Sequence, residues 1–262
     1  MQTGKEPVGA ERADASKDRR NHGISWGRVT VAILLFAMPA AAWLAGRESA
    51  AAAVPPAQLV DTTKLPIHSR QLRIAILPLH APGNTDSART DWFSQAELDQ
   101  LPESLASVFP FEFEVLGPLA IPEDCYDSKR GQYLTDRMLD WLREDHDRRY
   151  FRVIGISPHD LTDADHNWLF GQAQIGGPAC VASNYRILRG VKYTRERQRE
   201  LWHQIIQHEL GHTLGLPHIE DRRSLMCYAD SLAEHNDTGN IILPSEWRYL
   251  ESIHNFIWDR EE

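Results

Sequence analysis

The chain has 262 residues, a formal net charge of −9 and 42% hydrophobic residues. This composition is too apolar for a disordered chain, and the length suits one globular domain with an appendage. Acidic residues outnumber basic ones over most of the sequence, and no long run of Lys and Arg interrupts it. We therefore expect no nucleic-acid partner.

The N-terminal appendage has the features of an export or membrane segment. Residues 1–28 form a basic tail with six basic and four acidic residues, and residues 29–46 carry no charge. As a helix, residues 29–46 would span roughly 27 Å, just enough to cross a bilayer. Pro39 and the alanines after it favour a cleaved signal peptide, whereas the long tail favours an uncleaved membrane anchor. Both interpretations predict an exported protein on the periplasmic or extracellular face, either secreted or anchored.

Cysteine usage is sparse, with Cys125, Cys180 and Cys227 only. In an oxidising compartment these residues allow at most one internal disulfide, and Cys125 with Cys180 is the candidate pair. Because the sequence contains no C-x-x-C pair, we expect no zinc site built from cysteines.

The remaining chain predicts a linker followed by one domain. Residues 47–70 are rich in Ala and Pro and lack periodicity, which is typical of a linker, so we place the domain at residues 71–262. Apolar runs and alternation predict strands, and apolar residues at helical spacing predict helices. In chain order we expect a strand at 72–79, a helix at 94–109 whose start is delayed by Pro102, a strand at 111–121, a helix at 131–146, strands at 152–157, 168–175 and 180–187, a long helix at 195–215 and a final helix at 245–259. This order predicts an α/β (α+β) domain with a mixed, twisted sheet.

The stretch HELGHTLGLPH carries three histidines and a glutamate at fixed spacings. His208 and His212 are four residues apart on the long helix, so both imidazoles leave the same face and suit one zinc ion. Gly215 can end the helix in a left-handed conformation, after which the chain returns His218 as a third ligand. Glu209 lies about 100° further round the helix, where its carboxylate can reach a water on the metal.

This arrangement predicts a metallopeptidase. Three neutral imidazoles leave Zn²⁺ with an open position, where bound water has a pKa of about 7. Glu209 would take the proton of that water, which attacks a polarised peptide carbonyl, and return it to the leaving amine. The extended string H-E-x-x-H-x-x-G-x-x-H, followed by a methionine turn, is the metzincin signature. Met226 follows His218 at a suitable distance to be that Met-turn, an apolar floor beneath the imidazoles.

With these residues in place, the domain resembles the archaemetzincins (archaelysins), a family of the metzincin clan. The resemblance covers most of residues 72–232 and includes RGQYLTDRMLDWL, VIGISPHDLTDADHNWLFGQA, ACVASNYRIL and the zinc string. It implies a metzincin-like catalytic domain with the active-site helix behind a mixed sheet and WLFGQAQI as the edge strand above the cleft. A peptide or protein substrate could add to this edge at Phe170, Gly171 and Gln172.

Two departures from the family pattern lead to further expectations. The resemblance implies a second, structural zinc held by cysteines, two of which would fall at Ile219 and Ser224. Because cysteines are missing there, we expect one Zn²⁺ per chain, with packing of the C-terminal helix in place of the cross-link. The resemblance also implies Phe at position 228. Tyr228 is instead similar to the tyrosine of the astacin and serralysin branches, which ligates zinc and swings away to bind the intermediate, so it is a second candidate catalytic residue.

Two other functions stay open at this stage: a zinc-containing peptide-binding protein with little turnover, and a hydrolase of cell-wall peptide amides. The presence of Glu209 argues against a pure binder, because binding alone does not need that carboxylate. We expect His203, His235 and His254 to lie in the core or on the surface and not to ligate the metal.

Overall fold

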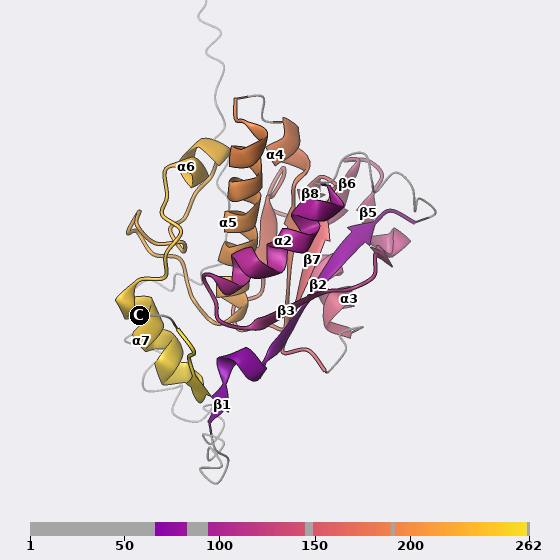
Figure 1. The fold of residues 1–262 in the computed structure, drawn as a ribbon. Coiled ribbons are helices and arrows are strands. Elements are labelled where there is room, and N and C mark those ends of the chain that lie inside the picture. Colours follow the sequence, from indigo (N-terminus) through magenta and orange to yellow (C-terminus); the bar gives the residue numbers. More distant parts are fainter. Residues whose placement is uncertain (1–65, 83–93, 145–148, 190–191, 261–262) are drawn as a thin grey trace, which may run out of the picture.

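The computed structural model describes residues 66–82, 94–144, 149–189 and 192–260. Its centre is a six-stranded sheet with the order β3-β2-β7-β10-β9, in which β4 also pairs with β2 (Figure 1). All neighbours are parallel except β9, which runs antiparallel to β10 at the edge. The mixed sheet predicted from the sequence is confirmed. Its strands are β2 (Arg73–His80), β3 (Glu112–Val115), β4 (Leu119–Ala120), β7 (Arg152–Ser157), β9 (Gly171–Ala173) and β10 (Ala179–Ser183).

Helices cover both faces of this sheet (Figure 1). Helices α2 (Gln95–Ala106) and α5 (Arg195–Thr213) pack on one face, and α3 (Thr135–Glu144) packs on the other. Successive side chains of a strand point to opposite faces, so Ile74 packs in the α2 and α5 layer and Ala75 in the α3 layer. Because both faces are buried, the central strands have continuous apolar sequences.

Helix α2 begins at Gln95, one residue after the start of the range predicted for it, and Pro102 causes no delay. The Ser94 hydroxyl accepts a hydrogen bond from the Glu97 amide, and the Glu97 carboxylate accepts one from the Ser94 amide. This capping box satisfies two amides that would otherwise lack partners, and it fixes the start of the helix. The prediction that Pro102 delays the start was wrong, because the helix continues through this proline.

Three predicted elements are divided differently in the structure. The strand expected at 111–121 splits into β3 and β4, because Pro118 between them has no amide to donate to the sheet. The first residues of the helix expected at 131–146 form the strand β6, because they pair with β5 and β8, and the helix begins only at Thr135. The strand expected at 180–187 ends at Ser183, and a short helix, α4, follows it. The elements concerned are β5 (Tyr126–Asp127), β6 (Gln132–Leu134), β8 (Leu161–Thr162) and α4 (Tyr185–Arg189).

The two ends of the described chain meet in a small sheet that the sequence did not predict. β1 (Ile67–His68) pairs in parallel with β11 (Phe256–Ile257), which follows the C-terminal helix α7 (Pro244–Ile253). The Asp259 carboxylate accepts hydrogen bonds from the ring of His68, at 2.8 Å, and from the Arg70 amide, at 3.2 Å. These contacts hold α7 beside the body of the domain. The remaining short helices are η2 (Ser69–Gln71), η4 (Glu123–Cys125) and α6 (Leu232–Asn236).

The exported or membrane-anchored location predicted from residues 29–46 needs correction. Across 66–82, 94–144, 149–189 and 192–260, no helix has both the length and the hydropathy needed to cross a bilayer. The segment 29–46 itself lies outside the described residues. The search of the described helices overturns the exported location, and the assignment of residues 29–46 as a signal peptide or membrane anchor stays a prediction.

The predicted disulfide between Cys125 and Cys180 was also wrong. All three cysteines are buried and free. Cys125 packs in the layer beneath α3, whereas Cys180 packs in the layer beneath α2 and α5. The two thiols therefore lie on opposite sides of the sheet. Burial raises the pKa of the Cys125 thiol to about 11, which keeps it protonated and unreactive.

Packing of α3 on the sheet depends on a glycine in β7. A Cβ at Gly155 would lie 2.8 Å from Cδ1 of Leu79 and 3.0 Å from Cδ1 of Leu142. Gly155→Ala should therefore lower the free energy of unfolding by about 1–3 kcal/mol in denaturant titrations. Gly117→Ala is the matched control, because nothing lies within 4 Å of its Cβ position. It should change stability by less than about 0.5 kcal/mol. Equal losses in both variants would contradict this packing.

Candidate metal centre

Helix α5 carries two of the three predicted ligands, and its C-terminus directs the chain toward the third. The Gly215 amide donates to the carbonyl of His212, at 2.9 Å, and the Leu216 amide donates to the carbonyl of Gly211, at 3.0 Å. Gly215 has φ +102°, the left-handed conformation that the sequence predicted at this point. The chain reverses there and returns His218 to the helix.

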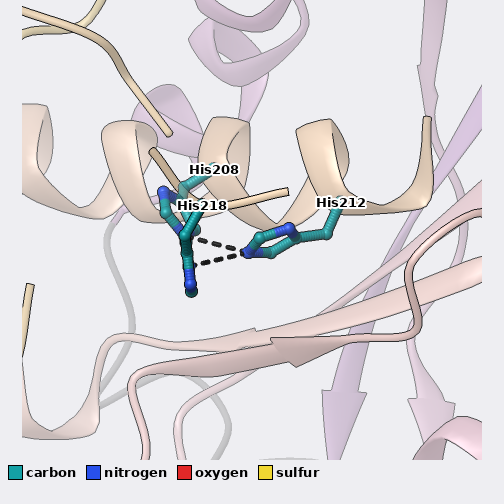
Figure 2. A group of neighbouring side chains, drawn as sticks. All are labelled: His208, His212 and His218. Carbon is teal, nitrogen blue, oxygen red and sulfur yellow. Dashed lines mark hydrogen bonds between the residues drawn. The ribbon is translucent and has the colours of Figure 1, made fainter. Parts of the chain in front are cut away.

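The three imidazoles converge (Figure 2). Nε2 of His208 lies 2.9 Å from Nε2 of His218 and 3.1 Å from Nε2 of His212, and the third separation is 3.0 Å. In a tetrahedral zinc site with ligands at about 2.0–2.1 Å, ligand nitrogens lie roughly 3.3 Å apart. The observed separations are within a few tenths of an ångström of that value. The residues predicted as ligands are therefore brought together.

Hydrogen bonds set the protonation of two of these rings. Nδ1–H of His208 donates to the carbonyl of Leu225, and Nδ1–H of His212 donates to that of Leu216, both at 2.8 Å. Each ring then presents an Nε2 lone pair to the centre. Burial lowers the pKa of all three imidazoles, for His218 to about 3, so the rings are neutral. Three converging lone pairs repel one another unless a cation lies between them, and a zinc ion fits this donor set.

Glu209 lies beside the triad and against the edge strand. Its side chain is buried, and this burial raises the pKa of the carboxyl to about 8. A divalent cation in the triad would oppose that shift by favouring the charged form. A Cβ on Gly171 of β9 would lie 2.7 Å from Cγ and 2.9 Å from Oε1 of Glu209. Only a glycine lets the edge strand approach Glu209 this closely, and the sequence alone did not reveal this contact.

Met226 lies where the sequence placed the Met-turn. It is fully buried, and a Cβ on Gly211 would lie 2.5 Å from its sulfur. Met226 therefore packs against the turn of α5 that lies between His208 and His212. The glycine of the H-E-L-G-H string provides the space for this sulfur.

Ser224 and Glu246 form a buried contact that sequence reasoning missed. The Ser224 hydroxyl donates to the Glu246 carboxylate, at 2.8 and 2.9 Å, and accepts from the Met226 amide, at 2.8 Å. Glu246 belongs to α7 and also accepts from the Leu243 amide, at 2.7 Å. The next residue after Ser224 is Leu225, whose carbonyl orients His208. Helix α7 is thus tied to the ligand loop at one of the positions where the resemblance implied a cysteine.

Tyr228 and the predicted edge-strand residues line the same cleft as the triad. This cleft has a volume of about 650 Å³ and is lined by residues that include Phe170, Gly171 and Gln172. The Tyr228 ring lies edge-on to His218, with 5.2 Å between centroids, and its hydroxyl donates to the Asp230 carboxylate. The tyrosine is therefore near a candidate ligand but is held by a neighbouring carboxylate.

The other histidines that the structure describes lie outside the group that could hold a metal. His203 contacts the Ser104 hydroxyl, and His254 contacts the carbonyl of Leu214, each at 2.8 Å and away from the cleft. His235 is different, because it is buried in the wall of the cleft. Its position could not be recognised from the sequence, since His235 belongs to no motif.

Comparisons with known proteins agree with this geometry. The family model of the matrixins matches residues 145–241. An archaemetzincin of Methanopyrus kandleri is 40% identical over 116 residues, which cover 44% of this chain and 63% of that protein. An archaemetzincin of Haloarcula marismortui is 30% identical over 138 residues, which cover 50% of this chain and 79% of that protein. The crystal structure of the M. kandleri protein superimposes with a TM-score of 0.57 at 27% identity, covering 69% of this chain and 94% of that one.

Removal of the third imidazole should greatly weaken zinc binding. We expect His218→Ala to lower zinc affinity by more than about 100-fold, because loss of an outer-shell partner alone costs 10–100-fold. Competition with a chromogenic chelator measures this affinity. His68→Ala removes an exposed histidine that pairs with Asp259, so zinc affinity should not change. Equal affinity of both variants would contradict the ligand role of His218.

Proposed function

Because this chain belongs to the archaemetzincin family of zinc metallopeptidases, we propose that it hydrolyses peptide bonds with Glu209 as the proton-transferring base. The observation that carries this proposal is the buried carboxylate of Glu209, one residue after His208 on α5. Among the described residues, no group donates a hydrogen bond to this carboxylate, and burial is the cause of its raised pKa. The carboxylate is therefore available for a water molecule or a substrate in the cleft.

In the proposed reaction, zinc supplies Lewis-acid chemistry when bound, by polarising the peptide carbonyl and lowering the pKa of water. Glu209 takes a proton from the attacking water and delivers it to the amine nitrogen that leaves. Water supplies the atoms that complete the new carboxyl group.

The edge strand β9 is the proposed binding site for an extended peptide. Its one partner in the described part of the sheet is β10, so its outer edge can pair with substrate. Main-chain hydrogen bonds along Phe170, Gly171 and Gln172 would fix the register of the peptide, although the carbonyl of Phe170 itself accepts from the Ser183 amide, at 2.7 Å. Because Gly171 lies against Glu209, a peptide bound at this edge would pass beside the proposed base.

Tyr228 is the second proposed catalytic residue. Its hydroxyl is bound to Asp230, and its ring contacts His218. To act in the reaction, the hydroxyl would exchange Asp230 for the carbonyl oxygen of the substrate. This exchange needs only a rotation of a side chain at the rim of the cleft.

Digestion of a proteome-derived peptide library tests the role of Glu209. The wild type should give chelator-sensitive cleavage, and Glu209→Gln should lose about 10²–10⁴-fold in rate, the usual contribution of a general base. The zinc content of this variant should equal that of the wild type. Glu200→Gln changes an exposed glutamate of the same helix and should keep full activity. Products from Glu209→Gln at the wild-type rate would contradict the proposal, and absence of cleavage by every variant would favour a peptide-binding protein.

We also propose that each chain binds one zinc. Among the described residues, the one group of three or more potential ligands that could hold a metal is the histidine triad. The pair Ser224 and Glu246 supports the proposal, because its hydrogen bonds cross-link the ligand loop to α7. Such a link can replace one made by a structural metal.

Elemental analysis measures this stoichiometry. Protein dialysed against trace-metal buffer after zinc loading should contain one equivalent of zinc, because the triad is the one such donor set in the described part of the chain. His218→Ala should lose that equivalent under the same dialysis. Two equivalents in the wild type would contradict a single site.

A further inference from the structure

His235 lies next to the metal centre but belongs to no role assigned so far. Its ring is edge-on to His208, with 6.1 Å between centroids, and edge-on to Phe170, with 5.6 Å between centroids. The side chain thus spans from a candidate ligand to the segment that leads into the edge strand β9. It lines the cleft together with Glu209 and Tyr228.

The segment that carries His235 is fastened to the helix that carries the ligands. The Arg197 guanidinium donates to the side-chain oxygen of Asn236, at 2.8 Å, and to its carbonyl, at 3.3 Å. The Gln204 amide group donates to the Thr238 hydroxyl, at 2.9 Å, and to the carbonyl of Gly239, at 3.0 Å. Both donors belong to α5. The residues that directly follow His235 in the chain are therefore bound to α5, and these bonds fix the position of His235 relative to the triad.

The ring nitrogens of His235 are available to a ligand. Among the described residues, no group makes a hydrogen bond to them, and neither nitrogen is fully enclosed by protein. This differs from His208 and His212, whose Nδ1 atoms donate to carbonyl oxygens. An imidazole ring carries at least one N–H group in either protonation state, so His235 has a donor to offer.

His235 is not part of the converging group of ligand atoms, which comprises His208, His212 and His218. A polar ring in the wall of the cleft, close to the metal centre and without a hydrogen-bond partner among the described residues, is suited to meet the substrate. Tyr228, the other donor proposed for the carbonyl oxygen of the substrate, donates to Asp230 in this structure and would have to rotate to reach that oxygen. In peptide hydrolysis, negative charge develops on the oxygen of the scissile carbonyl, and a fixed donor at that oxygen lowers the barrier.

We propose that His235 is a further catalytic residue, whose ring N–H donates a hydrogen bond to the oxygen of the scissile carbonyl. The hydrogen bond strengthens as charge builds on that oxygen, and no proton is transferred. This inference rests on the proposed peptidase function and assigns an additional residue to its site.

Two substitutions separate hydrogen bonding from packing. His235→Phe keeps a ring against Phe170 and His208 but removes the donor, whereas His235→Gln keeps an N–H donor without the ring. With the zinc-loaded full chain, kcat should fall about 100-fold in His235→Phe, with little change in KM, as for the loss of one oxyanion donor. His235→Gln should recover most of that loss. Ala233→Ser, at an exposed position of the same helix, should leave kcat unchanged.

Two binding measurements accompany the kinetics. Zinc affinity, measured with a competing chelator, should stay within about twofold in all variants, because His235 is not proposed as a ligand. Affinity for a phosphinic peptide, whose tetrahedral phosphorus carries two oxygens, should fall in His235→Phe in parallel with kcat. Wild-type kcat in His235→Phe, a loss that His235→Gln does not restore, or a loss of zinc affinity would each overturn the proposal.

Failure of the proposed function gives a different result. In that case the wild type does not cleave any peptide, and the phosphinic peptide alone decides the role of His235. Weaker binding to His235→Phe than to the wild type would then support the hydrogen bond. Equal binding, or no binding to either protein, would overturn it.

Discussion

The metal centre depends on two carbonyl oxygens that hold the Nδ1 atoms of His208 and His212. The acceptors belong to Leu225 and Leu216, which lie on segments that leave the end of α5 and then return to it. Because these bonds fix both tautomers, the Nε2 lone pairs must face each other and His218. The left-handed turn at Gly215, the Met-turn and the tie between Ser224 and Glu246 all serve to place these two carbonyls or the third ring.

The second constraint on the site is the close packing of its segments against helix α5, which two glycines allow. Gly211 admits the sulfur of Met226 beneath the ligand turn, and Gly171 admits Glu209 beneath the edge strand. These two glycines let the floor and the edge strand of the site contact the ligand helix directly. The same closeness brings His235 and Phe170 together at the wall of the cleft. The site is therefore built from α5, β9 and the segment after Met226, each within contact of the next.

The sequence predicted the local parts of this structure well. The spacing of the histidines, the glycine at the helix end and the alternation of apolar residues are local signals, and they identified the triad, the turn at Gly215 and the mixed sheet. Contacts between distant segments were not predicted, because no local pattern encodes them. Glu246 lies 22 residues after Ser224, and His68 lies 191 residues before Asp259. The start of α2 and the disulfide were mispredicted for a similar reason. The capping box at Ser94 sets the start of the helix, and Cys125 and Cys180 lie on opposite faces of the sheet.

X-ray absorption at the zinc edge tests the central claim most directly, because it reports the atoms around the metal in the loaded protein. The account predicts imidazole nitrogens at about 2.0–2.1 Å as the protein ligands, with an oxygen from solvent or substrate completing the shell. The imidazole contribution should fall in His218→Ala. A sulfur at about 2.3 Å, the distance of a zinc–cysteine bond, would contradict the account.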